Sequence, residues 1–270
     1  MPDIFDLLLR WWKKILLVVI LSVVAVGTIL YLKPKLYLST ATSVPASSVA
    51  ADKSKIFGDN IQGLYSNLGN SDDLDMIIGT ASLDTVYLFV ADSFSLKDHY
   101  KFEEENSLAR IHSADKLKSR SRVFKSDYGE LKIKVWDTDK NLAPQLANTI
   151  MAKLQQMHQD LQAAGNTTTL AALQKKLAGL KLAQDSAGSG GPHEWSSHQL
   201  ELSQQIDSYL KLINQYQLML ENKPLVLIPV EKARASLRID KPRILEDTVT
   251  AALLSLLFAL LAALVLDRNK

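Results

Sequence analysis

Residues 15–31 have the sequence ILLVVILSVVAVGTILY, which contains neither a charged residue nor a proline. With the adjoining Leu32, this stretch has about the length that the hydrocarbon core of a bilayer requires. A second uncharged stretch, TVTAALLSLLFALLAALVL, occupies residues 248–266 and is followed by Asp267 and Arg268. Helices in soluble cores seldom stay uncharged for so long. We therefore predict one transmembrane helix at residues 15–32 and a second at residues 248–266.

The first stretch is expected to stay in the protein as an anchor and not to be cleaved as a signal peptide. Its apolar part is longer than the roughly 7–15 residues of a signal-peptide core. The small residues that could form a cleavage site, at positions 39–41, lie well past its apolar edge, behind Lys33, Pro34 and Lys35. An uncleaved membrane helix fits both observations better.

Two spans place both termini on one side of the membrane and the chain between them on the other. Basic residues stand on the flanks of the spans that face the chain termini: Arg10, Lys13, Lys14, Arg268 and Lys270. Basic residues also stand on the flanks that face the segment between the spans: Lys33, Lys35, Lys241 and Arg243. The difference in charge is weak, but long loops are largely exempt from the positive-inside rule, so the basic residues of the short tails decide the orientation. We expect cytoplasmic tails at residues 1–14 and 267–270 and an outward-facing domain between the spans.

Composition excludes several classes of function. The chain has 270 residues, a net charge of +2 and no cysteine. Nearly balanced charge gives no indication of nucleic-acid binding. The absence of cysteine removes disulfides, thiolate catalysis and cysteine-ligated metal. The segment between the spans, residues 33–247, is long enough for one hydrophobic core and an extension.

The outer segment is expected to begin with a small α/β base. Period-two alternation from Leu36 to Val44, ended by Pro45, predicts a strand. Helical spacing of apolar residues predicts a short helix within residues 52–70, a second helix through Ile78 capped by Ser71 or Asp72, and a third through Val90 capped by Asp84. Two strands, around residues 123–124 and 131–135, are predicted on either side of a turn at residues 127–129. A short strand at residues 225–229 and a link at residues 233–242 lead back to the membrane.

Two leucine-rich seams predict a helical hairpin. The first seam comprises Leu146, Ile150, Leu154, Met157 and Leu161, and it resumes at Leu170, Leu173, Leu177 and Leu180 after Gly165, Asn166 and three threonines break its phase. The second comprises Leu202, Ile206, Tyr209, Ile213, Tyr216 and Leu220. Between them, residues 186–192 (SAGSGGP) predict a flexible turn. Asp137, Thr138 and Asp139 offer helix caps before the first seam, with Pro144 in an early turn.

These elements predict an α+β membrane protein in which two transmembrane helices flank an α/β base domain with a protruding antiparallel helical hairpin. The expected base comprises residues 33–140 and 223–247, next to the membrane. The expected long helices and hairpin comprise residues 141–222, with the tip at about residues 186–194.

Neither the histidines nor the acidic clusters point to catalysis. The five histidines are His99, His112, His158, His193 and His198. The pair His193 and Glu194 with His198 misses the spacing of a zinc-protease motif by one residue, so we expect exposed histidines and no metal. Acidic clusters at residues 72–75 and 103–105 are interpreted as helix caps and surface. With no G-x-S-x-G motif, we predict no enzyme and no cofactor.

Two surfaces are candidates for contact with partners. The run KLKSRSRVFK at residues 116–125 offers Lys116, Lys118, Arg120 and Arg122 to an acidic sugar polymer or an adjacent protomer; the alternative is a solvated strand edge protected by charge. The hairpin offers Leu202, Ile206, Tyr209, Ile213 and Tyr216. The hairpin could pack only on itself, but further leucines beside the seams (Leu200, Leu210, Leu212 and Leu218) favour packing against neighbouring protomers.

Two motifs carry a family resemblance. Residues 133–148, IKVWDTDKNLAPQLAN, place Asp137 and Asp139 in a turn and Ala143, Ala147 and Asn148 at a helix start. Residues 230–242, VEKARASLRIDKP, place Ser236, Ile239 and Pro242 at intervals of three after Ala233. Both motifs, and the order of elements over almost the whole chain, resemble the polysaccharide co-polymerases, the Wzz-type chain-length determinants. That family has prolines at these intervals after the alanine, whereas only Pro242 is proline here, which leaves the link less stiff.

The resemblance implies a homo-oligomer, a closed ring, in the bacterial inner membrane with its main domain in the periplasm. It implies regulation, by scaffolding, of the chain length of an O-antigen of lipopolysaccharide, a capsule or an exopolysaccharide made by a membrane polymerase. We expect a kinase-less member, because the chain has no G-x-x-x-x-G-K-S/T motif and ends four residues past Leu266. One alternative is an adaptor of an export machine that acts with a separate kinase or outer-membrane channel. A sensor ranks last, because it needs a cytoplasmic output domain.

Overall fold

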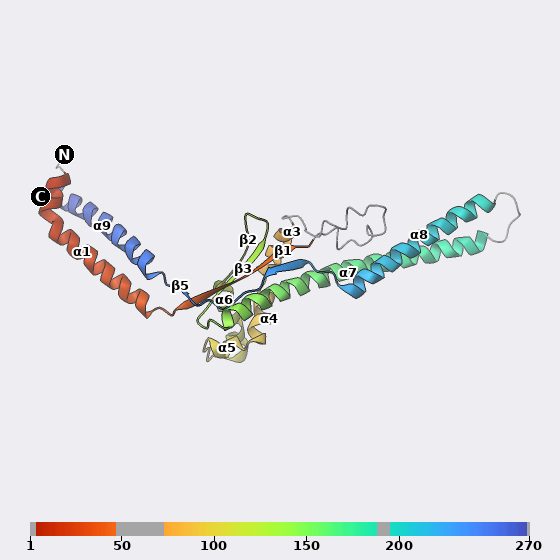
Figure 1. Cartoon of the computed structure of the whole chain (residues 1–270), viewed down its shortest axis with the longest axis horizontal. Helices are drawn as coiled ribbons and strands as arrows, with labels where there is room; N and C mark the ends of the chain where they lie inside the picture. The colour runs from red at the N-terminus through yellow and green to blue at the C-terminus, as the bar shows by residue number, and fades with distance from the viewer. Residues whose placement is uncertain (1–3, 47–72, 188–194, 269–270) are drawn as a thin grey trace. The chain divides into compact units, whose positions relative to one another are not determined.

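The computed structural model describes residues 4–46, 73–187 and 195–268, and the chain divides into two compact units. The first unit comprises Met1–Ser39, Trp136–Ala143 and Ala235–Lys270. The second comprises Thr40–Val135 and Pro144–Arg234. Figure 1 shows the elements and their order along the chain. The predicted helix within residues 52–70, the caps at Ser71 and Asp72 and the hairpin tip lie outside the described residues.

The first unit contains the two predicted membrane helices, α1 (Ile4–Leu32) and α9 (Ile244–Arg268). Within them, residues 11–32 and 244–266 are long and apolar enough to cross a membrane, as the sequence predicted. Ile15 of α1 is buried with Ala259 and Ala263 of α9. Small residues four apart on one helix allow close approach of a partner helix in a membrane. The remaining large apolar side chains of both helices are mostly exposed, which fits a lipid surrounding.

A short strand pair completes the first unit. Strand β5 (Ile239–Lys241) pairs antiparallel with the beginning of β1 (Leu36–Pro45), with Tyr37 opposite Ile239. β5 was not predicted, because its three residues are too few to show an alternation of apolar and polar side chains. The chain passes from the first unit to the second within β1.

The second unit is built on a sheet with the strand order β2 (Ser121–Lys125), β3 (Leu131–Asp137), β1 and β4 (Leu227–Glu231). In this sheet, β2 pairs antiparallel with β3, and β1 pairs antiparallel with β4. Strands β2 and β3 form the predicted hairpin, and Gly129 adopts a φ of 73° in its turn. Along β3, Leu131, Ile133 and Val135 are fully buried and the residues between them are half-buried. This is the period of two that predicted the strand.

Among its described residues, the base of this unit also contains the helices α3 (Asp73–Ala81), α4 (Asp84–Ser93), α5 (Leu96–His99) and α6 (Asn106–Ser119). Helices α3 and α4 meet at 63° and are together apolar enough to pass as one bent membrane span. They instead bury Leu74, Ile77, Val86 and Val90 in the protein core. The predicted α3 and α4 are confirmed.

One prediction for these helices was wrong, and one helix was not predicted. Asp84 is not the cap of α4: Leu83 holds that position without a side-chain cap, and Asp84 is the first helical residue. Helix α6 was missed, because its buried face consists largely of small residues, Ala109, Ser113 and Ala114, with only Leu117 large. Such a face gives little hydrophobic periodicity.

The predicted hairpin is present as α7 (Leu142–Ala187) and α8 (Trp195–Asn222), which lie side by side (Figure 1). Leu177, Ile206 and Ile213 form its buried cluster, with Leu170, Leu173, Leu180 and Tyr209 packed against it. Helix α7 continues without a break through Gly165 and the three threonines, whose hydroxyls donate to carbonyls four residues earlier. The interrupted leucine pattern therefore does not interrupt the helix.

The first seam departs from the prediction near its middle. Leu146, Ile150 and Leu154 are fully buried as expected, but His158 is next, at 2% exposed, and Leu161 is 58% exposed. An α-helix has 3.6 residues per turn, so a stripe predicted with a period of 3.5 drifts off the contact face. The expectations of an exposed His158 and a buried Leu161 are both corrected.

Candidate functional site

Two residues of the family motifs meet in the second unit. The Asn148 side chain donates from Nδ2 to the carbonyl oxygen of Ala233 (3.2 Å) and accepts from the Ala233 N–H at Oδ1 (2.9 Å). Ala233 is buried, and so is Ala147, the motif alanine directly before Asn148. A primary amide has a donor and an acceptor side by side, so it can satisfy both backbone groups of one residue. Asn148 thereby fixes the segment after β4 against the start of α7.

Further polar residues of α7 hold the segment that returns from the hairpin. Gln155 Oε1 accepts from the Leu227 N–H (2.7 Å). Gln159 Nε2 donates to the carbonyl oxygens of Lys223 (2.9 Å) and Pro224 (3.0 Å). Asn148, Gln155 and Gln159 are seven and four residues apart, which places them on one face of the helix. The sequence reasoning missed this row of amides, although its helical spacing is visible in the sequence.

Lys223 is the residue where α8 turns back toward β4, and its backbone is strained. Its φ is 36°, in the left-handed region that non-glycine residues seldom adopt. Its carbonyl is bound by Gln159, and its ammonium lies 3.6 Å from Asp160. Both contacts come from α7, so α7 fixes the geometry of this turn.

A groove of 350 Å³ lies beside this row of amides in the second unit. Its lining is mainly apolar or neutral, with one carboxylate and one ammonium: Ala41, Thr42, Ser43, Asn148, Met151, Ala152, Gln155, Leu225, Leu227, Pro229, Glu231 and Lys232. Of its hydroxyl groups, that of Ser43 donates to the sulfur of Met151 (3.2 Å). The groove suits packing and hydrogen bonding.

The two motif aspartates shape the turn before α7. Asp137 is fully buried and accepts at Oδ1 from the Asp139 N–H (2.9 Å). Asp139 accepts at Oδ1 from the Asn141 N–H (2.8 Å), and its carbonyl accepts from the Ala143 N–H (3.1 Å). These carboxylates bind N–H groups of the turn itself. Within the first unit, Trp136 Nε1 donates to the side chain of Asp240 (2.7 Å), which is two residues before the motif residue Pro242.

Most of the predicted basic run is engaged within the protein. Lys116 lies 4.8 Å from the Tyr100 ring centroid and 5.0 Å from that of Phe102, and the Arg120 guanidinium lies 5.3 Å from the Tyr100 ring. The Lys118 ammonium lies 2.6 Å from Asp84, which raises the pKa of that lysine. These contacts join the end of α6 to its neighbours.

The last of the four candidate cations lies elsewhere. Arg122 on β2 and Lys134 on β3 each lie 5.3 Å from the Phe124 ring, on the strand that ends the sheet order. The four predicted cations therefore form two groups, one at the end of α6 and one on the edge strand.

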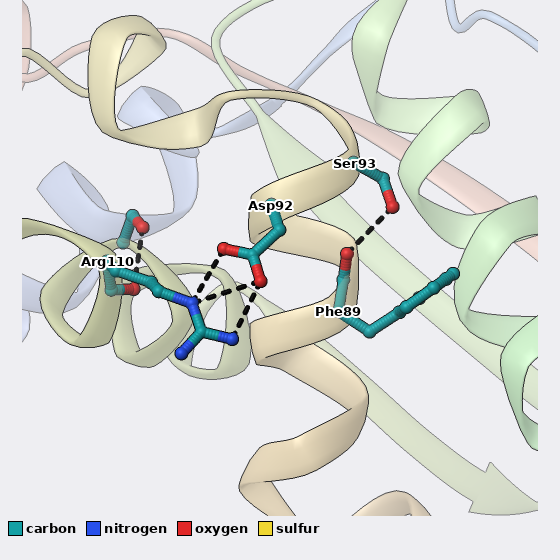
Figure 2. Close-up of polar contacts among 5 residues, drawn as sticks. Phe89, Asp92, Ser93 and Arg110 are labelled. Atoms are coloured by element: carbon teal, nitrogen blue, oxygen red, sulfur yellow. Dashed lines mark hydrogen bonds and ion pairs between the residues drawn. The ribbon is translucent and has the colours of Figure 1, made fainter. Parts of the chain in front are cut away.

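A bidentate ion pair joins α4 to α6 (Figure 2). Arg110 donates from Nε to both Asp92 oxygens (2.8 and 3.0 Å) and from Nη2 to Oδ2 (2.7 Å). The guanidinium holds the pKa of the Asp92 carboxyl below its ordinary value. On the same helix, the Phe89 ring lies 4.3 Å from the Lys153 ammonium of α7. Helix α4 is thus tied to both α6 and α7.

The structure separates the two sets of apolar hairpin residues that the sequence offered for contacts between protomers. Leu202, Ile206 and Ile213 are buried within the chain, and Tyr209 and Tyr216 are half-buried. The exposed apolar side chains are their neighbours Leu200 (60% exposed), Leu210 and Leu218. Leu200 and Leu218 are 18 residues apart, which is five helical turns, so they stand on one line along α8.

Among the described residues, no group of three histidine, cysteine, aspartate or glutamate side chains could hold a metal ion. His112 contacts Glu104 at 2.6 Å, and His99 packs on Tyr100. His193 and Glu194 lie outside the described residues, as does the His198 side chain.

The described residues define a mixed α/β protein with a membrane-length helix near each end and a long helical hairpin. The sequence matches no family profile and no curated protein. Among solved structures, the chain is similar to a full-length bacterial polysaccharide co-polymerase, at 16% identity and a TM-score of 0.40, over 100% of this chain and 97% of that one. It is also similar to a fragment of WzzB, a polysaccharide co-polymerase from Salmonella Typhimurium, at 16% identity and a TM-score of 0.40, over 77% of this chain and 100% of that one. Both names are those of the family that the motifs resemble.

Proposed function

We propose that this chain is an oligomeric scaffold of the bacterial inner membrane that regulates the chain length of a surface polysaccharide made by a membrane polymerase. The observation that carries the proposal is the contact between Asn148 and Ala233. These residues come from the two motifs on which the family resemblance rests, and they meet although 85 residues separate them.

The packed helix pair α1 and α9 anchors this scaffold. Both termini lie in the cytoplasm, and residues 33–247 lie in the periplasm. The domain division expected from the sequence, a base at residues 33–140 and 223–247 and a hairpin at residues 141–222, belongs to the same proposal. The scaffold acts on the polymerase by contact and positioning.

Protomers meet through the exposed line of α8 that includes Leu200 and Leu218. In a heterologous interface, one surface of a protomer contacts a different surface of the next protomer. Such an interface generates a closed ring when the rotation that relates neighbouring protomers returns to the first copy. Lys116, Lys118, Arg120 and Arg122 remain candidates for a contact with an acidic polymer or an adjacent protomer. Of these, Arg122 lies with Lys134 on the edge strand and is the first to test.

Deletion of the gene tests the function directly. We expect the length distribution of the surface polysaccharide, resolved on a gel, to lose its preferred length and to regain it when the intact gene is supplied. An unchanged distribution in the deletion strain would remove this function. Complementation with the double variant Leu200→Glu and Leu218→Glu is expected to fail, whereas complementation with Gln205→Glu, an exposed position on another side of α8, is expected to succeed.

The proposed topology has a test of its own, because the chain has no native cysteine. Tyr128, at the turn between β2 and β3, is replaced by cysteine in one variant. Trp12, near the start of the apolar segment of α1, is replaced in another; both side chains are exposed. In spheroplasts, a membrane-impermeant maleimide is expected to label the Tyr128→Cys protein at once and the Trp12→Cys protein only after lysis. The reverse order of labelling would invert the topology and exclude a periplasmic scaffold.

A further inference from the structure

A pocket of 460 Å³ lies in the first unit, where the two membrane helices leave their apolar segments. It is formed between the end of α1, the residue at the start of β5 and the first turn of α9. Apolar side chains and charged groups share its lining: Leu30, Tyr31, Lys33, Lys35, Ile239, Pro242, Arg243, Ile244, Leu245 and Glu246.

The charge of this pocket is positive. Lys33, Lys35 and Arg243 contribute three cations and Glu246 one carboxylate. Glu246 is matched by Arg243, whose Nη1 lies 3.1 Å from its Oε2. Within the residues that the structure describes, no carboxylate pairs with Lys33 or Lys35. Two lysines therefore face the pocket with their charge uncompensated, which favours an anionic occupant.

The position of the pocket adds to this preference. Helix α9 begins at Ile244, and the first N–H groups of a helix lack intrahelical acceptors and carry partial positive charge. Leu30 near the end of α1 is buried and Leu245 in this first turn of α9 is exposed, and from these residues both helices continue into their apolar segments. An occupant that fits must therefore be anionic at one end and apolar at the other. Tyr31 lies in the lining at the level that aromatic residues favour at a membrane interface.

We propose that this pocket binds the phosphate headgroup of an anionic phospholipid, with Lys33 and Lys35 as its charged contacts and Leu30 and Leu245 beside the start of its acyl chains. The site rests on α1 and α9 spanning the membrane, but it does not depend on the chain regulating a polysaccharide. A bound lipid would link the two helices at the point where they join β1 and β5. Its headgroup would thereby brace the entry of both helices into the folded part of the chain.

A short-range optical measurement tests the site in the full chain. Val249 lies one helical turn past Leu245 and is exposed, so Val249→Cys gives a single attachment point for a bimane fluorophore next to the pocket. The labelled protein is reconstituted into phosphatidylcholine bilayers that contain a small share of either phosphatidylglycerol or phosphatidylcholine carrying a doxyl quencher near the headgroup. We expect stronger quenching by the phosphatidylglycerol quencher, because it collects in the pocket.

Charge variants decide where the selectivity arises. Lys33→Gln with Lys35→Gln is expected to remove the preference for phosphatidylglycerol, at about fivefold per lysine, since a basic residue near an anionic bilayer surface contributes about 1 kcal/mol. The matched control, Lys13→Gln with Lys14→Gln, removes two lysines from the other end of the same helix and is expected to keep the preference. Equal loss in both pairs, or no loss in the first, would overturn the proposed site.

A second arm tests the need for acyl chains. Glycerol 3-phosphate at millimolar concentration is expected to leave the quenching unchanged, because it lacks the apolar part. Displacement of the lipid by this soluble phosphate would overturn the lipid assignment. The polysaccharide of the corresponding strain is analysed in parallel, so that failure of the lipid site and failure of the proposed function give different results.

Discussion

The side chain of Asn148 and the backbone of Ala233 exchange two hydrogen bonds, one in each direction. The pair closes the second unit at the point where the chain has completed the hairpin and β4. Few other side chains could replace Asn148 here, because a carboxylate lacks the donor and a shorter hydroxyl lacks the reach to serve both groups of one residue.

Replacing Asn148 by alanine is therefore expected to lower the free energy of unfolding by about 1–3 kcal/mol, since both backbone groups of the buried Ala233 lose their partner. Chemical unfolding of the solubilised full chain, followed by circular dichroism, measures the change. Asn222→Ala is the matched control, because that amide donates to the Leu218 carbonyl of its own helix at an exposed position. We expect the control to change stability by less than about 0.5 kcal/mol. Equal losses would contradict the importance of this contact.

Ile206→Ala is expected to destabilise the chain by about 2–5 kcal/mol, because it opens a cavity in the cluster between α7 and α8. Gln205→Ala on the same helix is expected to cost less than about 0.5 kcal/mol, because that side chain is exposed and lies off the proposed contact line. The same unfolding measurement compares the two. A larger loss for Gln205 than for Ile206 would mean that the helix faces are assigned the wrong way round.

Leu200→Glu combined with Leu218→Glu is expected to reduce the mass of the assembly without lowering the stability of the protomer. The reason is that carboxylates on this line would be desolvated in a contact between copies, at a cost of several kcal/mol. Light scattering after size exclusion in detergent gives the mass, with Gln205→Glu as the control for added charge. An unchanged mass for the double variant would exclude this line as the contact between protomers.

His158 makes stability depend on pH. Burial lowers the pKa of this imidazole below its ordinary value of 6.5, so the folded chain keeps it neutral where the unfolded chain already binds a proton. The stability that neutral His158 contributes is complete above the pKa of this imidazole in the unfolded chain. It falls as the pH drops below that value, and it stops falling once the pH is below the lower pKa of the imidazole in the folded chain. Between about pH 7.5 and about pH 5.5, the wild type is expected to lose more stability than His158→Met. Parallel losses would show that His158 is not the group responsible.

Asp92 titrates with the opposite sign. Because Arg110 holds the pKa of Asp92 below its ordinary value of 3.8, the pair stabilises the fold above that value and is lost as the pH falls through the lowered one. Asp92→Asn is expected to narrow the difference in stability between neutral and strongly acidic solution. Asp98→Asn, at an exposed carboxylate on α5, serves as the control. No difference between the two variants in an acid titration would count against the role of the ion pair.

The elements that the sequence predicted correctly share a repeated pattern. Period two in β3, a long uncharged run in α1 and the alternate spacing of Ile206 and Ile213 in α8 each follow from local geometry. The elements that it missed lack such a pattern. Helix α6 buries small residues, and β5 is too short to alternate.

Contacts between distant residues were beyond the reach of the sequence. Spacing alone places Gln155 and Gln159 on one face of α7, but only the fold brings Leu227 and Lys223 to them. The same is true of Lys118, whose partner Asp84 lies 34 residues earlier, and it explains why a run of cations predicted as a surface is largely paired.

The unbroken course of α7 through Gly165 makes it a lever. Its 46 residues extend over about 70 Å, so a rotation of about 5° at the end held by Asn148 and Gln155 would carry the far end through about 6 Å. A small rotation at the end of α7 near Asn148 and Gln155 is thereby amplified with distance along the helix. The hydrogen bonds of these two amides limit the displacement of the far end.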